Sequence, residues 1–334
     1  MAKAEKLPSG KWRVRAKANG KQKSFTHENR KIAEAQAKSW QAGMTKEAQS
    51  SEKLTLFEAY EKFIEIKKNV LSPSTILGYT NLKKTSFKDI MHLKIDRINS
   101  VDVQRSINMF AANHSPKSVK NAYGLFTAVM SMFMPDSHFN VKLPQKQPKE
   151  IYIPTDEDIK RLVQLSKGTS MYIPILLAAF GGMREGEIAA LTSDDIINGY
   201  FVIINKSMVL TPSKEWIIKP PKTISSNRKI ELPSFVIEAI KQKNGRIVNQ
   251  NPHVISINFS KLLKANNMPH FRFHDLRHYY VSSLHALNIP DKYIQAQGGW
   301  STNHTMNNVY KHIMESKKSE FSNKITAYFD SFLN

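Results

Sequence analysis

The hydrophobic pattern of the chain opens with a period of two. Between residues 12 and 26, apolar residues alternate with basic ones, and Asn19-Gly20 divides the run into two halves. Asparagine and glycine readily adopt positive φ, so this stretch predicts a tight β-hairpin with one cationic face. An alanine-rich segment over residues 30–42, ended by Gly43, predicts a helix that covers the other face. The basic positions of the hairpin are Arg13, Arg15, Lys17, Lys21 and Lys23.

A period near 3.6 residues follows and predicts an all-helical region over residues 54–134. The preceding residues 41–53 are polar and lack periodicity, which indicates a linker. Serine or threonine before a glutamate or proline marks helix starts, because these residues satisfy or fit the first helical turn. The aromatic and methionine stripes of the helices indicate a buried core rather than a ligand site. The predicted starts are the capping box of Thr55 and Glu58, Ser74, Ser100, and Ser115 with Pro116.

Beyond a proline- and lysine-rich stretch at residues 136–154, helical and strand patterns are mixed. Thr155 with Asp158 predicts another capped helix, and a strongly apolar helical region that follows is broken at Gly181-Gly182. Short strands are predicted where β-branched and aromatic residues cluster, and they would form a small sheet. The predicted strands are residues 200–205, 216–218 and 230–232.

Together these patterns predict an α+β multidomain protein. At 334 residues the chain exceeds the usual size of one domain. We expect a small N-terminal module of β-sheet plus helix, an all-α domain, a mainly α domain with a small antiparallel sheet, and a terminal helix. Their predicted bounds are residues 1–50, 54–140, 150–316 and 317–334, respectively.

The charge of the chain narrows its range of partners. The net charge is +21, and it divides into +8, +6 and +7 over residues 1–50, 51–148 and 149–334. Because every segment is basic, a polyanion such as DNA can be contacted along the whole chain, and a merely solvated surface is the alternative. The cationic hairpin face can lie in a major groove, although a solvated lysine face would show the same pattern.

Other compositional features exclude several classes. No uncharged apolar run is long enough to cross a bilayer, and the first ten residues lack the apolar segment of a signal peptide. Cysteine is absent, so disulfides and thiolate metal sites are excluded. We therefore expect a cytoplasmic protein without a membrane partner.

The C-terminal half carries residues suited to phosphoryl transfer without a metal. Attack on a DNA phosphodiester places extra negative charge on the non-bridging oxygens, which planar guanidinium groups can bind in a bidentate manner. Tyrosine can act as the nucleophile, while other groups transfer protons, so neither a metal nor another cofactor is expected. Glu187 lies one turn after Arg184 and can orient that side chain. The candidate catalytic residues are Arg184, Lys222, His274, Arg277, Trp300 and Tyr310.

Five short strings in this half resemble the sequence boxes of the tyrosine recombinases, the phage-type integrases. Each string alone is a weak signal, whereas five in order at suitable intervals are specific. The resemblance is strongest over residues 150–315. The strings are residues 181–188 (GGMREGEI), Pro221-Lys222-Thr223 with Ser226 and Arg228, residues 274–278 (HDLRH), Gly298-Gly299-Trp300, and Tyr310-Lys311-His312.

The resemblance implies a site-specific recombinase that integrates or excises a phage or mobile element through a 3′-phosphotyrosine intermediate and a Holliday junction. Tyr310 would be the nucleophile, and His274 would assist its proton transfer. Lys222, on a β-hairpin, would protonate the departing 5′ oxygen, and Trp300 would donate a hydrogen bond to the phosphate. His304 is the alternative to Trp300 in this role. Lys219, three residues before Lys222, is the alternative hairpin lysine.

The resemblance also implies double-stranded DNA and protein partners. The module at residues 1–50 would bind arm-type attachment sites, and residues 54–140 would bind core sites. Residues 317–334 would link the subunits of a homotetramer on DNA, or else pack on their own domain. DNA-bending and excisionase-type proteins would be its accessory partners. The apolar stripe of this last segment is Phe321, Ile325, Tyr328, Phe329 and Phe332.

Other functional classes stay open at this point. A type IB topoisomerase would use the same chemistry without an arm-binding module, and a conservative transposase of the same family would differ only in its biology. A DNA-binding regulator without catalysis would form no covalent adduct. His274 and His278, with His270 nearby, also have the spacing of a zinc ligand pair, but acidic or thiol ligands are not adjacent.

Overall fold

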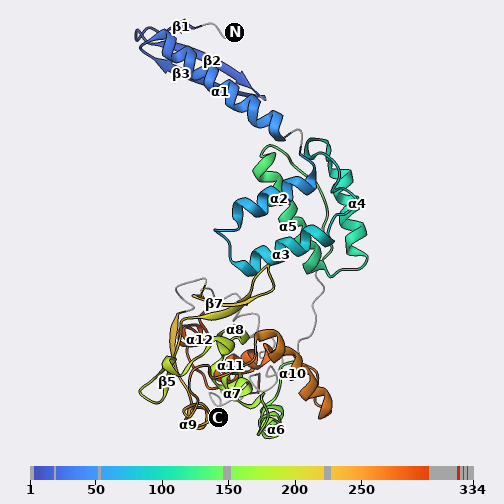
Figure 1. Cartoon of the computed structure of the whole chain (residues 1–334), viewed down its shortest axis with the longest axis vertical. Helices are drawn as coiled ribbons and strands as arrows, with labels where there is room; N and C mark the ends of the chain where they lie inside the picture. Colours follow the sequence, from blue (N-terminus) through green and yellow to red (C-terminus); the bar gives the residue numbers. More distant parts are fainter. Residues whose placement is uncertain are drawn as a thin grey trace. The chain divides into compact units, whose positions relative to one another are not determined.

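The computed structural model of the chain describes residues 4–18, 20–51, 54–145, 152–221 and 227–300, and a few positions between 322 and 329; side chains are described only up to residue 43 in the second of these ranges. The chain divides into two compact units, residues 1–148 and 149–334 (Figure 1). The boundary between them falls inside the proline- and lysine-rich stretch at residues 136–154.

The first unit begins with a three-stranded antiparallel sheet. Its strands are β1 (Glu5–Lys6), β2 (Trp12–Ala18) and β3 (Lys21–His27), in that order, so the predicted hairpin is confirmed and gains a short third strand. Alternate residues of β2 point toward the helix α1 (Arg30–Ser51), which covers one face of the sheet. The small core between them consists of Val14, Ala16, Ala33 and Ala37.

Helix α1 is longer than predicted, and the linker expected at residues 41–53 is wrong for most of its length, because the helix continues through Gly43 to Ser51. One glycine inside a helix costs only about 1 kcal/mol, and the surrounding alanine, glutamine, glutamate and lysine residues favour helix.

The rest of the first unit is helical, as predicted. The capping box of Thr55 and Glu58 is present, and Ser115 caps the helix that begins at Pro116. One start differs, because the proline at position 73 fits the first turn and the helix begins there rather than at Ser74. The helices are α2 (Leu56–Lys67), α3 (Pro73–Thr85), α4 (Ser100–Ala111) and α5 (Pro116–Phe133).

A core rich in aromatic residues joins these helices. Phe87 packs edge-on against Phe126 with 6.0 Å between the ring centroids, and both side chains are buried. Tyr60 is also fully buried, and its hydroxyl has no hydrogen-bond partner among the described residues. The aromatic and methionine stripes are therefore core, as the sequence predicts.

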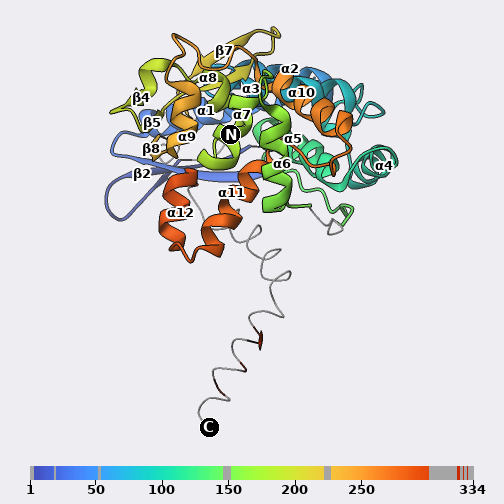
Figure 2. The same cartoon turned by 90° about the horizontal axis from the view of Figure 1, so that it is seen from below.

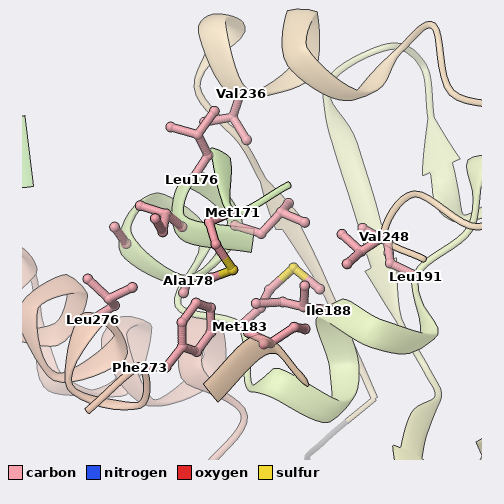
Figure 3. Packing of buried hydrophobic residues seen from close by; sticks show 14 of the residues in the cluster. Met171, Leu176, Ala178, Met183, Ile188, Leu191, Val236, Val248, Phe273 and Leu276 are labelled. Carbon is pink, nitrogen blue, oxygen red and sulfur yellow. The ribbon is translucent and has the colours of Figure 1, made fainter. Parts of the chain in front are cut away.

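The second unit is built around one apolar helix. Helix α7 (Tyr172–Gly181) buries seven of its ten residues, and Figure 3 shows Leu176 and Ala178 among the buried side chains contributed by neighbouring elements. The predicted Thr155 cap with Asp158 is present at the start of α6. The helices around α7 are α6 (Asp156–Ser166), α8 (Glu185–Ala190), α9 (Ser234–Ile240), α10 (Pro252–Ala265), α11 (Asp275–Ala286) and α12 (Asp291–Gly298).

Helices α11 and α12 pack side by side, as Figure 2 shows. Helix α11 also packs along α7, which carries the chain toward Gly182. The segments that hold Arg184, Arg277 and Trp300 are thereby brought together from distant parts of the sequence.

The strands of the second unit form two sheets rather than one. Strand β5 (Phe201–Ile204) pairs with β4 (Ile196–Ile197) and β8 (Arg228–Glu231), whereas β6 (Ser207–Leu210) pairs with β7 (Trp216–Lys219). The sequence did not reveal β6, whose partner follows it across a short turn. Because adjacent strands pair most readily, β7 is taken up by this hairpin and does not join β5.

The two small sheets and the seven named helices of this unit confirm the predicted fold class, a mixed protein with small antiparallel sheets. In the part of the chain that the structure describes, no helix combines the length and apolar character needed to cross a bilayer.

Candidate active site

A left-handed glycine places Arg184 at the start of a helix. Gly182 ends α7 with φ of +59°, and a Cβ there would lie 2.5 Å from the Tyr280 ring. Only glycine fits both conditions, so this position requires it. The chain turns sharply here, and Arg184 becomes the N-cap of α8 in an extended conformation.

Glu187 holds Arg184 from one turn further along α8. Its carboxylate accepts hydrogen bonds from the Arg184 backbone N–H (2.9 Å) and Nη1 (2.7 Å). It also accepts from Arg228 Nη2 at 2.8 Å and Nη1 at 3.1 Å. Burial alone would raise the pKa of Glu187, but these hydrogen bonds and the charges of Arg228 and Arg184 lower it to about 2. The group is therefore ionised at any physiological pH, and the predicted orienting role of Glu187 has a geometric basis.

Arg277 lies at the centre of the site, with its residue only 1% exposed. It extends from α11, and its Nη1 and Nη2 donate to the backbone carbonyls of Gly182 and Gly298. Arg184 Nη2 donates to the next carbonyl, that of Gly299, at 3.2 Å. Two guanidinium groups thus converge on adjacent peptide carbonyls.

Positive charge is concentrated around these two arginines. Burial, followed by the charges of Arg184 and Arg228, keeps the pKa of Arg277 well below its usual value. Among the residues that the structure describes, Glu187 is the carboxylate that accepts hydrogen bonds from Arg184 and Arg228. The one negative charge of Glu187 does not balance the three positive charges of Arg184, Arg228 and Arg277. The site therefore favours the binding of an anion such as a phosphate.

His274 stands directly before α11 and next to the arginines. Part of the residue remains exposed, yet loss of hydration around its ring, with the charges of His278 and Arg277, lowers the pKa of His274 to about 4. The imidazole is therefore neutral near pH 7 and able to accept a proton. The ring of His278 meets it edge-on, with 5.1 Å between centroids.

Trp300 completes the described part of the site. Its ring lies under the Arg277 guanidinium, 4.0 Å from the ring centroid to the guanidinium carbon, in a cation–π contact. The ring also occupies the space beside Gly298, where a Cβ would fall 1.8 Å from a ring carbon. The structure therefore brings Trp300 together with Arg184, His274 and Arg277.

Three predicted site residues, Lys222, His304 and Tyr310, lie outside the described residues. Their roles stay predictions, as does the choice between Trp300 and His304. Lys219 is described as the last residue of β7, but this does not decide which lysine acts. The apolar stripe expected between residues 321 and 332 also falls almost entirely outside the described residues. Among the described residues, no group of three or more histidine, aspartate or glutamate side chains is arranged to hold a metal ion.

Arg228 is a site neighbour to which the sequence reasoning assigned no role. It begins β8, its side chain is 5% exposed, and its Nε donates to the Gln297 carbonyl at 2.8 Å. The sequence contains an indication that Arg228 is buried, because Arg228, Ile230 and Leu232 occupy alternate positions and so lie on one face of a strand. An arginine in register with buried aliphatic residues indicates a buried ionic contact.

The basic residues of the N-terminal hairpin are divided between two faces. In the observed register Arg15 lies opposite Ser24, and Arg13 and Lys17 share that face, away from α1. Lys21 and Lys23 lie opposite Ala18 and Ala16, on the face that α1 covers, so the predicted cationic face contains three of the five basic residues, and DNA binding by all five stays a prediction. The pairing register of β2 and β3 sets the face of each lysine, because residues directly opposite each other on paired strands point to the same face. The open face consists of Arg13, Arg15, Lys17, Gln22, Ser24 and Thr26.

The described site lies in a part of the chain that matches a known protein family. Residues 153–317 match the model of the phage integrase family. A tyrosine recombinase XerC-like protein from Caldanaerobacter subterraneus subsp. tengcongensis is 23% identical, in an alignment that covers 94% of each chain.

Solved structures show the same fold. The Tn1549 transposon integrase, in complex with circular intermediate DNA, superposes with a TM-score of 0.68 at 18% identity and covers 77% of this chain and 94% of its own. A lambda integrase tetramer bound to a Holliday junction gives a TM-score of 0.60 at 16% identity, over 90% and 95% of the two chains.

The fold is that of a DNA breaking and rejoining enzyme. Residues 153–317 form a phage integrase family domain, which identifies the protein as a tyrosine recombinase of the integrase type.

Proposed function

We propose that this protein is a site-specific DNA recombinase that integrates or excises a phage or another mobile element. The observation that carries the proposal is the pair of guanidinium groups of Arg184 and Arg277. Both are held by fixed partners, and neutral His274 lies beside them. Such a preorganised pair can bind the non-bridging oxygens of a phosphodiester and stabilise the charge that develops during attack.

In the proposed reaction, the Tyr310 hydroxyl oxygen attacks the phosphorus atom and its proton passes to His274. The bond between phosphorus and the 5′ oxygen breaks, and Lys222 protonates that oxygen as it departs. The phosphate is then linked to the 3′ end of the DNA and to Tyr310. A 5′ hydroxyl from a partner strand reverses these steps, so neither ATP nor a metal is consumed.

The proposed assembly follows from the same comparison. The lambda integrase structure that resembles this chain is a tetramer on a Holliday junction. We infer that this protein also acts as a homotetramer, with residues 54–140 on core sites and the N-terminal sheet on arm sites. We expect it to act in the bacterial cytoplasm, with DNA-bending and excisionase-type proteins as accessory partners. The open hairpin face, with Arg15 and Lys17 beside Ser24, supports contact with a DNA groove.

A nicked DNA duplex tests the proposal. A binding site is first recovered from a random-sequence duplex pool with the full-length protein. It is then nicked so that the cleaved strand loses a short oligonucleotide and the intermediate accumulates. With EDTA present, the wild type should form a covalent protein–DNA adduct that resists denaturation, and Tyr310→Phe should form none while still binding DNA. Binding without an adduct in the wild type would favour a non-catalytic DNA-binding regulator and refute the proposal.

A further inference from the structure

Arg228 connects three segments that meet at the active site. Its Nη atoms donate to both carboxylate oxygens of Glu187 on α8, at 2.8 and 3.1 Å. Its Nε donates to the carbonyl of Gln297 at 2.8 Å, directly before the Gly298-to-Trp300 segment of the site. Arg228 itself begins β8, immediately after the segment that contains Lys222.

We propose that Arg228 is a positioning residue for DNA cleavage, which fixes Glu187, and through it the Arg184 guanidinium, while anchoring the segment that carries Trp300. This inference rests on the proposed recombinase function. Arg228 does not touch the scissile phosphate in this scheme.

The surroundings of Arg228 argue against a role in stability alone. A buried arginine beside two other guanidinium groups is costly, and apolar residues of similar volume often replace buried ion pairs with no loss of stability. The planar fork of arginine, however, can serve two carboxylate oxygens and a carbonyl at once, which neither lysine nor an apolar residue can do. The hydrogen bonds from Arg228 therefore fix the position of the Glu187 carboxylate.

Two variants separate the geometric contribution of Arg228 from its charge. Arg228→Met removes both the charge and the fork, and Arg228→Lys keeps the charge but loses the fork. Arg246 provides a matched control, because its Nη2 also donates within this unit, to the carbonyls of Ala189 (3.0 Å) and Gln250 (3.2 Å), and it does not contact Glu187. Arg246→Met should lower stability without a specific effect on cleavage.

The assay is single-turnover formation of the covalent adduct on the nicked duplex described above, at saturating protein. We expect Arg228→Met to slow adduct formation roughly 100-fold, the usual cost of misplacing a catalytic group by about 1 Å. Arg228→Lys should fall between that variant and the wild type. The apparent affinity for DNA should change little in both, because the displaced group acts on the transition state.

The pH dependence provides a readout that a structural role would not change. Glu187 is faced by Arg184 at the N-cap of α8, Arg228 on β8 and Arg277 on α11, with His274 and Tyr280 next to these arginines. In the wild type, the pKa of Glu187 near 2 keeps it ionised throughout the assay range. In Arg228→Met, burial acts on Glu187 without its main counter-charge, so the pKa rises and the carboxylate is protonated as the pH falls.

Arg228→Met should therefore lose cleavage activity progressively from pH 8 to pH 5, relative to the wild type, while Arg228→Lys and Arg246→Met should run parallel to the wild type. An Arg228→Met profile parallel to that of Arg246→Met, or an unchanged rate, would overturn the inference. If the wild type itself forms no adduct, the proposed function fails, and that result is distinct from the failure of the Arg228 inference.

Discussion

Replacement of Glu187 by glutamine tests the electrostatic basis of the site through protein stability. Glu187→Gln keeps the side-chain shape and removes one negative charge from a position that is 6% exposed. Arg184 and Arg228 would then face an amide in place of a carboxylate. Breaking a buried ion pair by removing one partner typically costs about 3–5 kcal/mol, and we expect a loss of this size near neutral pH.

The pH dependence of this loss follows from the pKa of Glu187. The pKa falls from an ordinary 4.5 to about 2 in the folded protein, so the ionised carboxylate contributes on the order of 3 kcal/mol. Because the folded value is the lower one, the contribution is complete above pH 4.5 and is lost as the pH falls toward 2. The loss approaches about 1.4 kcal/mol per pH unit below pH 4.5.

The measurement is denaturant unfolding of the full-length protein, followed by tryptophan fluorescence. Trp12 and Trp40 are replaced by phenylalanine, so that Trp216 and Trp300 report on the second unit. The difference in unfolding free energy between the Glu187 protein and Glu187→Gln should be constant from pH 7 to 5.5. It should then shrink by about 1.4 kcal/mol by pH 3.5.

A neighbouring glutamate supplies the control. Burial raises the pKa of Glu185, whose carboxylate accepts a hydrogen bond from Ser256 at 2.6 Å. A raised pKa means that the protonated form is favoured in the folded state, so the pH trend for Glu185→Gln should have the opposite sign. A difference below about 1 kcal/mol for Glu187→Gln, or one that does not change between pH 5.5 and 3.5, would refute the reasoning.

Two further substitutions test other parts of the structure. Gly298→Ala places a methyl group 1.8 Å from a carbon of the Trp300 ring. We expect this overpacking to lower the unfolding free energy by about 1–3 kcal/mol and to reduce formation of the covalent adduct strongly. Normal cleavage by this variant would contradict the placement of the ring. Tyr60→Phe removes a buried hydroxyl with no partner among the described residues, so thermal unfolding should show unchanged or slightly increased stability, by up to about 1 kcal/mol, and a marked loss would show that the hydroxyl is hydrogen-bonded.

Features set by neighbouring residues could be predicted from the sequence. The caps at Thr55, Ser115 and Thr155 depend on hydrogen bonds to backbone N–H groups within three residues, and all three are present. The break at Gly181-Gly182 is equally local, because a left-handed residue must end the helix there.

Features that depend on distant partners could not be predicted. The pairing of β8 with β5, which skips the β6–β7 hairpin between them, is a choice between strands that propensity does not resolve. The chemical types in the described part of the site could be predicted, because arginine and histidine suit the binding of a phosphate and the transfer of a proton. The contacts of Arg277 with two glycine carbonyls, and of Arg228 with Glu187, depend on elements far apart in the chain.

The N-terminal hairpin has a consequence for how its sequence can change. Arg15 and Val14 point to opposite faces only because of their odd and even positions along β2. One residue inserted into the strand would expose the apolar set and bury the charged set downstream of it, whereas two would restore both. Insertions and deletions in this strand should therefore be tolerated in pairs, and single ones should abolish the module even where they add only an alanine.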